Sequence, residues 1–578
     1  MNLRALSLLA TLAASAAAQG GPGTVLSHQK ISETQGGYTA DLFGGQAFAS
    51  SVAVVGDVDQ NGVVDLAVGL PGANEGTGSG AGAVDLLFRN PDGTVASSAR
   101  ISSASGGLAT PPDFFDHFGK SVAGLGDLDG DGTPDVAVGT DTVGRVYVLL
   151  LHPDGSVKTE ILIGPGSLGG EPDAADWFGD ALAFLGDVDG DGVGDLAVGA
   201  TRDDDGGQNR GAVYVLFLNG DGSVKASQKI SDTQGGFEGT LQDLDAFGTD
   251  VAALGDLDLD GVPDLAVSPA SDPQRPVFVL FLRPDGTVRS HAKVGIGLGG
   301  FTESAGPSFG MALAGVPDLS GDGLPELAAG EFTADDGQPG AGAVWLLFLD
   351  VDGSVKGSQK ISATEGGLAA PLDPHDWFGY SVAAGGDLDG NGAADLVVGA
   401  RQDDDDSSGS TFTNTGAIYT LDLRGPEGPI AIPYGCGVNP EGATTLISGA
   451  PVVGGSLTFG VDNQAGPQTP GSPAFVAVSL KPDPAFPCGT QLPGLSMFGP
   501  GLPGELLVSL VPGELLEPVL AGPPWGGPGL PSLIPGAIPN NPALVGQEFH
   551  AQGAILDPLP GAAVPLGLGN AWRFVIGP

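Results

Sequence analysis

Residues 24–425 repeat one pattern of apolar and polar positions. In one copy, an apolar segment that opens on Phe-Gly, 178–187, is followed after a polar loop by the short apolar run 195–199. The next run, 211–218, is apolar throughout, as in a strand that is buried on both faces. Apolar and polar residues then alternate over 223–231, which is typical of an outer strand with one exposed face. Each copy therefore predicts an antiparallel sheet of four strands.

The pattern occurs six times. The copies begin at Phe48, Phe118, Phe178, Phe247, Phe309 and Phe378, at intervals of 60 to 70 residues. This period suits the four-stranded blade of a β-propeller and is too long for ankyrin or leucine-rich repeats. The last copy ends at its third strand, 416–423, whereas a strand of the fourth type, 29–32, precedes the first copy. We expect this N-terminal strand to complete the last blade and close the ring; an open array is the alternative.

Composition supports an all-β protein. The 578 residues include 101 Gly and 47 Pro, which interrupt helices and are common in turn-rich β structure. The 69 acidic and 21 basic residues give a formal net charge of -48. Such a polyanion repels phosphate backbones and anionic lipid surfaces, so a nucleic-acid partner is excluded from the expected functions.

Every copy carries an acidic loop between its first and second strands. Oxygen-bearing side chains occupy loop positions 1, 3, 5 and 9, and Gly occupies position 6. The oxygen-bearing residues are Asp57, Asp59, Asn61 and Asp65; Asp127, Asp129, Asp131 and Asp135; Asp187, Asp189, Asp191 and Asp195; Asp256, Asp258, Asp260 and Asp264; Asp318, Ser320, Asp322 and Glu326; and Asp387, Asp389, Asn391 and Asp395. This ligand set predicts up to six Ca²⁺ ions, with solvated Asp-Gly turns as the alternative. The loops with a neutral ligand, Asn61, Asn391 or Ser320, should bind most weakly.

The Phe-Gly opening, the acidic loop and the Val-Gly-Ala ending resemble the FG-GAP repeats of the integrin α-subunit N-terminal β-propeller and its secreted bacterial relatives. Departures from the pattern are Ala49 after Phe48, Ser268-Pro269 in place of Gly-Ala, and Glu331 after Gly330. The resemblance implies a calcium-stabilised propeller that acts in binding or adhesion. The integrin propeller has seven blades, so we expect six blades here from the six copies and keep seven as the alternative.

The N-terminal segment 1–18 reads as a secretory signal peptide, with cleavage between Ala18 and Gln19. No later segment reaches the roughly 20 apolar residues that span a bilayer. We therefore expect a secreted or cell-surface protein without a transmembrane segment. In an exported chain, the two cysteines, Cys436 and Cys488, are most simply a disulfide.

The composition changes after Arg424. Residues 425–578 hold 27 of the 47 prolines but only 9 acidic and 2 basic residues, and the acidic loops end. Short apolar runs between Pro and Gly turns predict a smaller β-sandwich-like domain over 430–578. Surface attachment and a passive structural cap are both compatible with this domain.

The loops on the face opposite the acidic loops are long and differ between copies. They offer aromatic rings beside carboxylates, and loops on a rigid scaffold commonly bind ligands. The candidate residues of this ligand face are Trp177, Trp377, Asp203, Asp204, Asp205 and Asp404. The alternative is that both tryptophans pack between blades and the aspartates only solvate the rim.

No Gly-x-Ser-x-Gly, His-Glu-x-x-His or phosphate-binding motif occurs in the sequence. We therefore expect a binding or adhesion module for carbohydrate or protein at the cell surface, and no enzyme. The alternatives are a polysaccharide lyase or hydrolase built on the propeller and a purely structural envelope protein.

Overall fold

The computed structural model describes residues 21–425 except 41, 43–44, 76–78, 271–275, 389–392 and 405–413, and within 426–578 it describes ten strands and Ser472. The chain divides into two units, Met1–Gly425 and Pro426–Pro578. No helix occurs among the described residues, so none there has the length and apolar character to cross a bilayer. The expectation of an all-β protein is confirmed.

Six antiparallel sheets of four strands make up the first unit, and five of them take their strands in chain order. The five are β2 (Ser51–Gly56), β3 (Asp65–Leu70), β4 (Ala83–Arg89) and β5 (Val95–Ser102); β6 (Ser121–Gly126), β7 (Asp135–Gly139), β8 (Val146–Leu151) and β9 (Val157–Ile163); β10 (Phe178–Gly186), β11 (Asp195–Ala200), β12 (Ala212–Leu218) and β13 (Val224–Ile230); β14 (Asp250–Gly255), β15 (Asp264–Ser268), β16 (Val277–Leu282) and β17 (Val288–Val294); and β18 (Leu313–Val316), β19 (Glu326–Glu331), β20 (Ala343–Leu349) and β21 (Val355–Ser362). We call them blades one to five.

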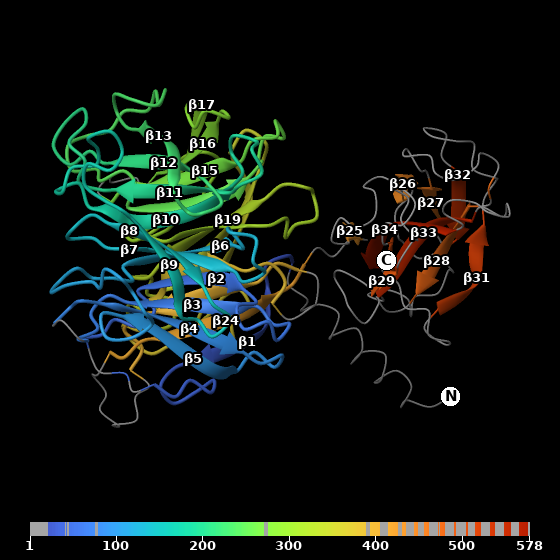
Figure 1. The fold of residues 1–578 in the computed structure, drawn as a ribbon, viewed down its shortest axis with the longest axis horizontal. Coiled ribbons are helices and arrows are strands. Elements are labelled where there is room, and N and C mark those ends of the chain that lie inside the picture. Colours follow the sequence, from blue (N-terminus) through green and yellow to red (C-terminus); the bar gives the residue numbers. More distant parts are fainter. Residues whose placement is uncertain are drawn as a thin grey trace, which may run out of the picture. The chain divides into compact units, whose positions relative to one another are not determined.

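The sixth blade joins the two ends of this unit. It contains β22 (Phe378–Ala384), β23 (Leu396–Ala400) and β24 (Ala417–Leu423), and its outer strand is β1 (Val25–Ile31). Strand β1 pairs antiparallel with β24, from Val25 opposite Leu423 to Ile31 opposite Ile418, and the two strands lie side by side in Figure 1. The first strands contact one another in cyclic order, and β22 contacts β2. The unit is therefore a closed six-bladed β-propeller; the count of six is confirmed and the alternative of seven is wrong.

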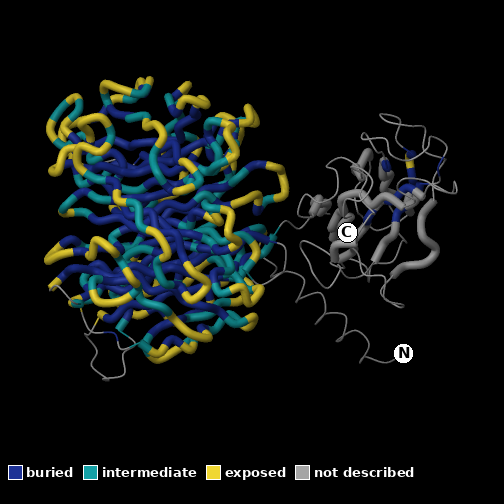
Figure 2. Tube along the Cα trace, in the orientation of Figure 1, coloured by how far each residue is buried: buried dark blue, intermediate teal, exposed yellow. Residues whose placement is uncertain are grey.

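Burial follows the position of a strand within its blade. The third strands β4, β8, β12 and β16 are buried at every residue, whereas the outer strand β13 has exposed residues between its ends. Figure 2 shows the same contrast between buried strands and exposed loops across the propeller. Apolar side chains from neighbouring blades share the buried layers between the sheets, which supply the main stabilisation of the ring.

The two glycines of the repeat let neighbouring blades approach closely. A Cβ atom on Gly199, at the end of β11, would lie 2.2 Å from the carbonyl oxygen of Gly248 in the Phe-Gly pair of the next blade. Gly139 has the same relation to Gly179, at 2.0 Å. The Phe before Gly248, Phe247, is fully buried and pairs through its backbone with Gly211 of the preceding blade. The repeated Phe-Gly and Val-Gly pairs are thus the contact points between blades.

The described residues of the second unit form ten strands in three sheets. Their bounds are β25 (Ile430–Tyr434), β26 (Thr444–Ser448), β27 (Ser456–Val461), β28 (Ala474–Ser479), β29 (Thr490–Leu492), β30 (Gly504–Leu506), β31 (Leu515–Ala521), β32 (Ser532–Ala537), β33 (Glu548–Leu556) and β34 (Leu566–Val575). Strands of the five-stranded sheet contact the three-stranded sheet, β28 and β33 against β27 and β34 against β26. Two sheets that contact each other in this way agree with the predicted sandwich-like domain.

Candidate functional site

The five acidic loops that are fully described are shaped by hydrogen bonds to their own backbone. In the third blade, Asp187 Oδ1 accepts the N–H of Asp191 at 3.0 Å, and Asp187 Oδ2 accepts the N–H of Gly192 at 2.8 Å. Asp191 Oδ1 accepts the N–H of Val193 at 2.9 Å. The same bonds recur in the loops that begin at Asp57, Asp127, Asp256 and Asp318. Position 6 has φ between 87° and 91° in these five loops, a left-handed conformation that glycine adopts without a steric penalty.

The acid at position 9 is buried and joins the loop to the third strand. Asp195 is 0% exposed; its Oδ2 accepts the N–H of Val188 at 3.0 Å, and its Oδ1 accepts the N–H of Leu218 at 3.1 Å. Corresponding pairs of bonds are made by Asp65, Asp135, Asp264 and Asp395. Burial raises the pKa of Asp195 to about 6 and that of Glu326, the corresponding acid of the fifth blade, to about 7. A buried carboxylate of this kind is stabilised by a positive charge beside it.

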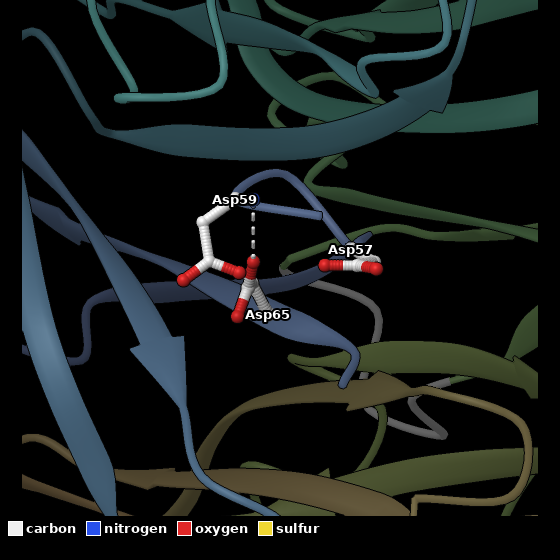
Figure 3. Close-up of side chains that lie close together, drawn as sticks. All are labelled: Asp57, Asp59 and Asp65. Carbon is white, nitrogen blue, oxygen red and sulfur yellow. Dashed lines mark hydrogen bonds between the residues drawn. The ribbon is translucent and has the colours of Figure 1, made fainter. Parts of the chain in front are cut away.

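Carboxylates from three loop positions gather at one place. In the first blade, Asp57, Asp59 and Asp65 each bring one oxygen within 4.8 Å of the others. Figure 3 shows these side chains close together, with the hydrogen bond that the Asp59 N–H donates to Asp65 Oδ2, which is 3.4 Å long. Comparable groups are Asp127, Asp129 and Asp131; Asp187, Asp189 and Asp195; and Asp256, Asp258 and Asp260. Carboxylates at this spacing repel one another unless a cation lies among them.

Two of these loops contain buried oxygens that receive no hydrogen bond from the protein. They are Asp189 Oδ1 and Asp258 Oδ1, both at loop position 3. A buried carboxylate oxygen without a donor is costly, and coordination to a cation removes that cost. The donor set consists of oxygens on a short loop, which Ca²⁺ accepts in irregular geometry and in numbers of six to eight. The residues present therefore fit a hard divalent cation.

All predicted ligands of the first five loops lie among the described residues. The first four loops each bring at least three of their four predicted residues together. In the fifth loop, the Ser320 N–H donates to Glu326 Oε1 at 3.1 Å. Asp389 and Asn391 of the sixth loop lie outside the described residues, as do Ala18, Gln19, Cys436 and Cys488.

The first strands of the blades surround a cavity of about 600 Å³ at the ends that lie away from the acidic loops. It is lined by the start of the first strand of all six blades and by residues of the loops between second and third strands, so it lies on the propeller axis. The residue after each Phe-Gly or Phe-Ala pair lines it. These six residues are Ser50, Lys120, Asp180, Thr249, Met311 and Tyr380. Six blades of nearly one sequence pattern thus present six different side chains to one axial cavity.

Charged groups occupy one part of this axial cavity. Lys120 Nζ lies 2.6 Å from Asp180 Oδ1, and the Thr201 hydroxyl donates to Asp180 Oδ2 at 2.8 Å. Burial alone would lower the pKa of Lys120, but the adjacent Asp180 carboxylate raises it overall. Asp250 Oδ2 accepts the N–H of Leu313 at 2.6 Å, and burial raises the pKa of Asp250 to about 7. This part of the cavity offers both a cation and carboxylates to a ligand.

Aromatic rings form another part of the wall. The rings of Trp377 and Tyr380 are stacked at 5.9 Å, and the Phe332 ring lies 5.2 Å from each. Tyr380, Phe332 and Arg401 line the axial cavity, whereas Trp377 is not among the lining residues and contacts the cavity wall through Tyr380 and Phe332. The other candidate tryptophan, Trp177, is covered by the guanidinium of Arg202 at 3.4 Å. Of the two predicted tryptophans, Trp377 is therefore the one connected to the cavity.

The four candidate aspartates of the ligand face do not line the axial cavity. Asp203 is only 2% exposed, lies 2.7 Å from Lys229 Nζ and accepts a hydrogen bond from the Tyr214 hydroxyl at 3.2 Å. Its carboxylate forms an ion pair and a hydrogen bond within its own blade, so the expectation that Asp203 faces a ligand is corrected. Asp205 is partly buried and accepts bonds from side chains of the same blade, whereas Asp204 is exposed and Asp404 is partly exposed.

Sequence reasoning found the loops of this face but missed the axial cavity. Lys120, Asp180 and Asp250 were not among the predicted residues, because single acids and bases are not informative in so acidic a chain. The available signal was the position after Phe-Gly or Phe-Ala, which differs in all six copies, whereas the Phe two positions before it is the same in all six.

Comparison with known families identifies the repeat. The FG-GAP repeat matches residues 118–149, 178–216, 309–347 and 378–421. The chain carries FG-GAP repeats. The four matches fall in blades two, three, five and six. Blades one and four contain the departures at Ala49 and at Ser268-Pro269, yet each has the same four strands as the matched blades. The FG-GAP propeller therefore tolerates these substitutions.

The FG-GAP propeller is also similar to integrin α subunits. Integrin alpha-PS2 of Drosophila melanogaster is 34% identical over 255 residues, which are 41% of this chain and 16% of that protein. Integrin alpha-5 of Xenopus laevis is 32% identical over 228 residues (38% and 20%), and integrin alpha-IIb of Homo sapiens is 32% identical over 294 residues (47% and 25%). The similarity thus covers a quarter or less of each of these relatives.

Proposed function

We propose that this FG-GAP propeller is an exported, calcium-stabilised binding or adhesion module that holds a carbohydrate or protein ligand in its axial cavity. The observation that carries the proposal is the ring of six different side chains around that cavity. A propeller that served only as a scaffold would repeat one residue there, as it repeats the buried Phe and the acidic loop. Diversity at equivalent positions favours recognition of a ligand that lacks sixfold symmetry.

The chemistry of the cavity supports a polar ligand with a flat apolar face. Lys120, Asp180 and Asp250 provide charged and hydrogen-bonding groups, and Tyr380 and Phe332 provide ring surface. Pockets that combine a few polar groups with aromatic walls are typical of small-ligand and peptide sites. The similarity to integrin α subunits supports a binding role, although it covers too little of those proteins to carry over their ligands or partners.

Calcium is proposed for the acidic loops. Chelation should lower the melting temperature, because the clustered carboxylates then repel one another and the folded state loses the free energy of cation binding. Calcium should restore the melting temperature better than magnesium, which requires stricter octahedral geometry. The measurement is a thermal melt in chelator, in Ca²⁺ and in Mg²⁺ at equal ionic strength. A melting temperature that is indifferent to chelator would contradict the calcium proposal.

The ligand proposal is tested on glycan and protein arrays in millimolar Ca²⁺ and again in chelator. Asp180→Asn and Tyr380→Ala should abolish or strongly weaken binding to any ligand found. Asp221→Asn, in the exposed turn between β12 and β13 of the same blade as Asp180, is the matched control and should bind as the wild type does. Retained binding by both cavity variants would contradict the axial site. Absence of any ligand, together with turnover of a polysaccharide, would favour the enzyme alternative.

Export and the disulfide are part of the same proposal. We expect removal of residues 1–18 so that the exported protein begins at Gln19, and oxidation of Cys436 with Cys488. Intact mass and thiol alkylation of the exported protein, with and without reductant, test both. An uncleaved N-terminus or two alkylated thiols without reductant would count against them.

A further inference from the structure

A basic residue on the fourth strand contacts the acidic loop of its own blade. In the second blade, Lys158 Nζ lies 2.6 Å from Asp129 Oδ2 and 2.5 Å from Asp131 Oδ2, which are loop positions 3 and 5. The corresponding contacts join Lys225 to Asp189 and Asp191, Arg289 to Asp258 and Asp260, and Lys356 to Asp322. Each base is the second residue of its strand, on β9, β13, β17 and β21.

The presence of this base follows the residue at loop position 5. Where position 5 is Asp, the second residue of the fourth strand is Lys or Arg. Where position 5 is Asn, at Asn61 and Asn391, the strand residue is Ala96 or Leu26. We call loop positions 3 and 5 and this strand residue the charge triad. By sequence, its net charge is -1 in five blades and zero in the fifth, where Ser320 replaces the acid at position 3.

In the third and fourth blades, the base contacts one oxygen of the position 3 carboxylate, and the other oxygen has no hydrogen-bond partner. In the second blade, Asp129 Oδ1 accepts the N–H of Asp131 at 3.2 Å. Lys225 Nζ lies 2.9 Å from Asp189 Oδ2, whereas Asp189 Oδ1 is buried and accepts no hydrogen bond. Arg289 contacts Asp258 Oδ2, and Asp258 Oδ1 is likewise buried without a partner. The base therefore neutralises the loop from one side and leaves an oxygen available to a cation.

A further base, Arg89, acts at a different loop position. It is buried at the end of β4, donates to the Val64 carbonyl at 3.2 Å, and interacts electrostatically with Asp65 and Asp395, the position 9 acids of the first and sixth loops. These are the two loops whose charge triad has no base. Arg89 leaves the charge of each triad unchanged.

We propose that the basic member of the charge triad sets the cation affinity of its loop, so that the five loops whose triad carries -1 hold their cations with similar strength, whether position 5 is Asp or Asn. The inference rests on the proposed calcium function of these loops. A positive charge near a bound divalent cation weakens its binding, and the base occurs only where loop position 5 is an acid. The loops of Asn61 and Asn391 are then not weak sites, and the loop of Ser320 is the weakest.

The test changes the charge of one triad and measures each loop separately. Hydrogen–deuterium exchange with peptide resolution, recorded against free Ca²⁺, gives a protection midpoint for every loop. Lys158→Met keeps the aliphatic stem and removes the charge, and should lower the midpoint of the 127–135 loop roughly tenfold, as expected for one unit charge near a divalent cation in a water-like dielectric. Lys158→Arg should stay within about twofold of the wild type, since Arg289 holds this place in the fourth blade.

The second arm removes the matching acid. Asp131→Asn should raise the Ca²⁺ midpoint of the same loop, and Lys158→Met combined with Asp131→Asn should return it towards the wild-type value, because the triad again carries -1. The 187–195 loop is the internal control and should not respond to any of these changes.

An unchanged or higher midpoint in Lys158→Met would overturn the inference, and so would a double variant no closer to the wild type than Asp131→Asn. If no loop of the wild type gains protection with Ca²⁺, the proposed calcium function fails together with the inference. Loops that are protected by Ca²⁺ but indifferent to Lys158→Met would remove the charge inference alone.

Discussion

The contact between blades gives a prediction in which the same substitution has opposite signs at two glycines. Gly199 is the penultimate residue of β11, and an added Cβ would lie 2.2 Å from the carbonyl oxygen of Gly248 and 3.3 Å from Ala181 Cβ. Gly357 lies within β21, where an added Cβ would meet only Phe348 Cδ2, at 3.5 Å, an ordinary van der Waals distance. Both glycines have backbone conformations open to alanine, so only the available space differs.

The magnitude follows from that space. At Gly199 the obstacle is backbone, so relief requires the two blades to separate by about 1 Å; overpacking of this kind costs about 1–3 kcal/mol or more. Alanine also lowers the conformational entropy of the unfolded chain, which stabilises the folded state by about 0.5–1 kcal/mol. We expect Gly199→Ala to lose about 2 kcal/mol and Gly357→Ala to gain up to about 1 kcal/mol. The unfolding entropy is roughly 2 cal/mol/K per residue, over a propeller of ~400 residues. The melting temperature should therefore fall by about 2–3 °C in Gly199→Ala and rise by about 1 °C in Gly357→Ala.

The assay is calorimetry of the full chain in saturating Ca²⁺, with urea midpoints as a second measurement. Circular dichroism at low temperature establishes that both variants are folded. If Gly199→Ala is folded and melts at or above the wild-type temperature, the close approach of blades is not what requires glycine at this position. A fall of equal size in Gly357→Ala would also refute the reasoning, because the cost would then belong to any strand alanine.

Two further predictions concern buried charges. Lys229→Met leaves Asp203 buried without its cation and should lower the free energy of unfolding, measured by urea denaturation, by about 3–5 kcal/mol. Adding Asp203→Asn should recover much of this loss. A double variant as unstable as the single variant would contradict the pairing. Burial raises the pKa of Asp250 to about 7 from 3.8, so the folded state holds this proton more tightly than the unfolded state, and the stabilisation is present at acid pH and lost as the pH rises through 7. Relative to Asp250→Asn, the wild type should therefore lose stability between about pH 4 and pH 7 and change little above that range, and a difference independent of pH would contradict it.

Much of the fold was predictable because it is encoded locally and repeated. The alternation of apolar residues, the buried run of the third strand and the acidic loop each lie within a few neighbouring positions. Six copies made the pattern unambiguous, and the unmatched strand at 29–32 indicated closure by β1. The loop hydrogen bonds of Asp187 and the glycine turn likewise depend on residues fewer than ten positions apart.

The tertiary structure decided what distant residues do to one another. The axial cavity brings together Lys120, Asp180 and Asp250, which the chain separates by 60 residues or more and which become neighbours because the first strands of successive blades contact one another. Lys158 meets the loop of Asp129 because the sheet places the outer strand beside it, and Asp203 is a buried ion pair because Lys229 lies opposite. Periodicity along a chain reports which face of a strand is buried. It does not report which charged side chains meet across strands. The strength of the interaction between them depends on how far the assembled fold excludes water.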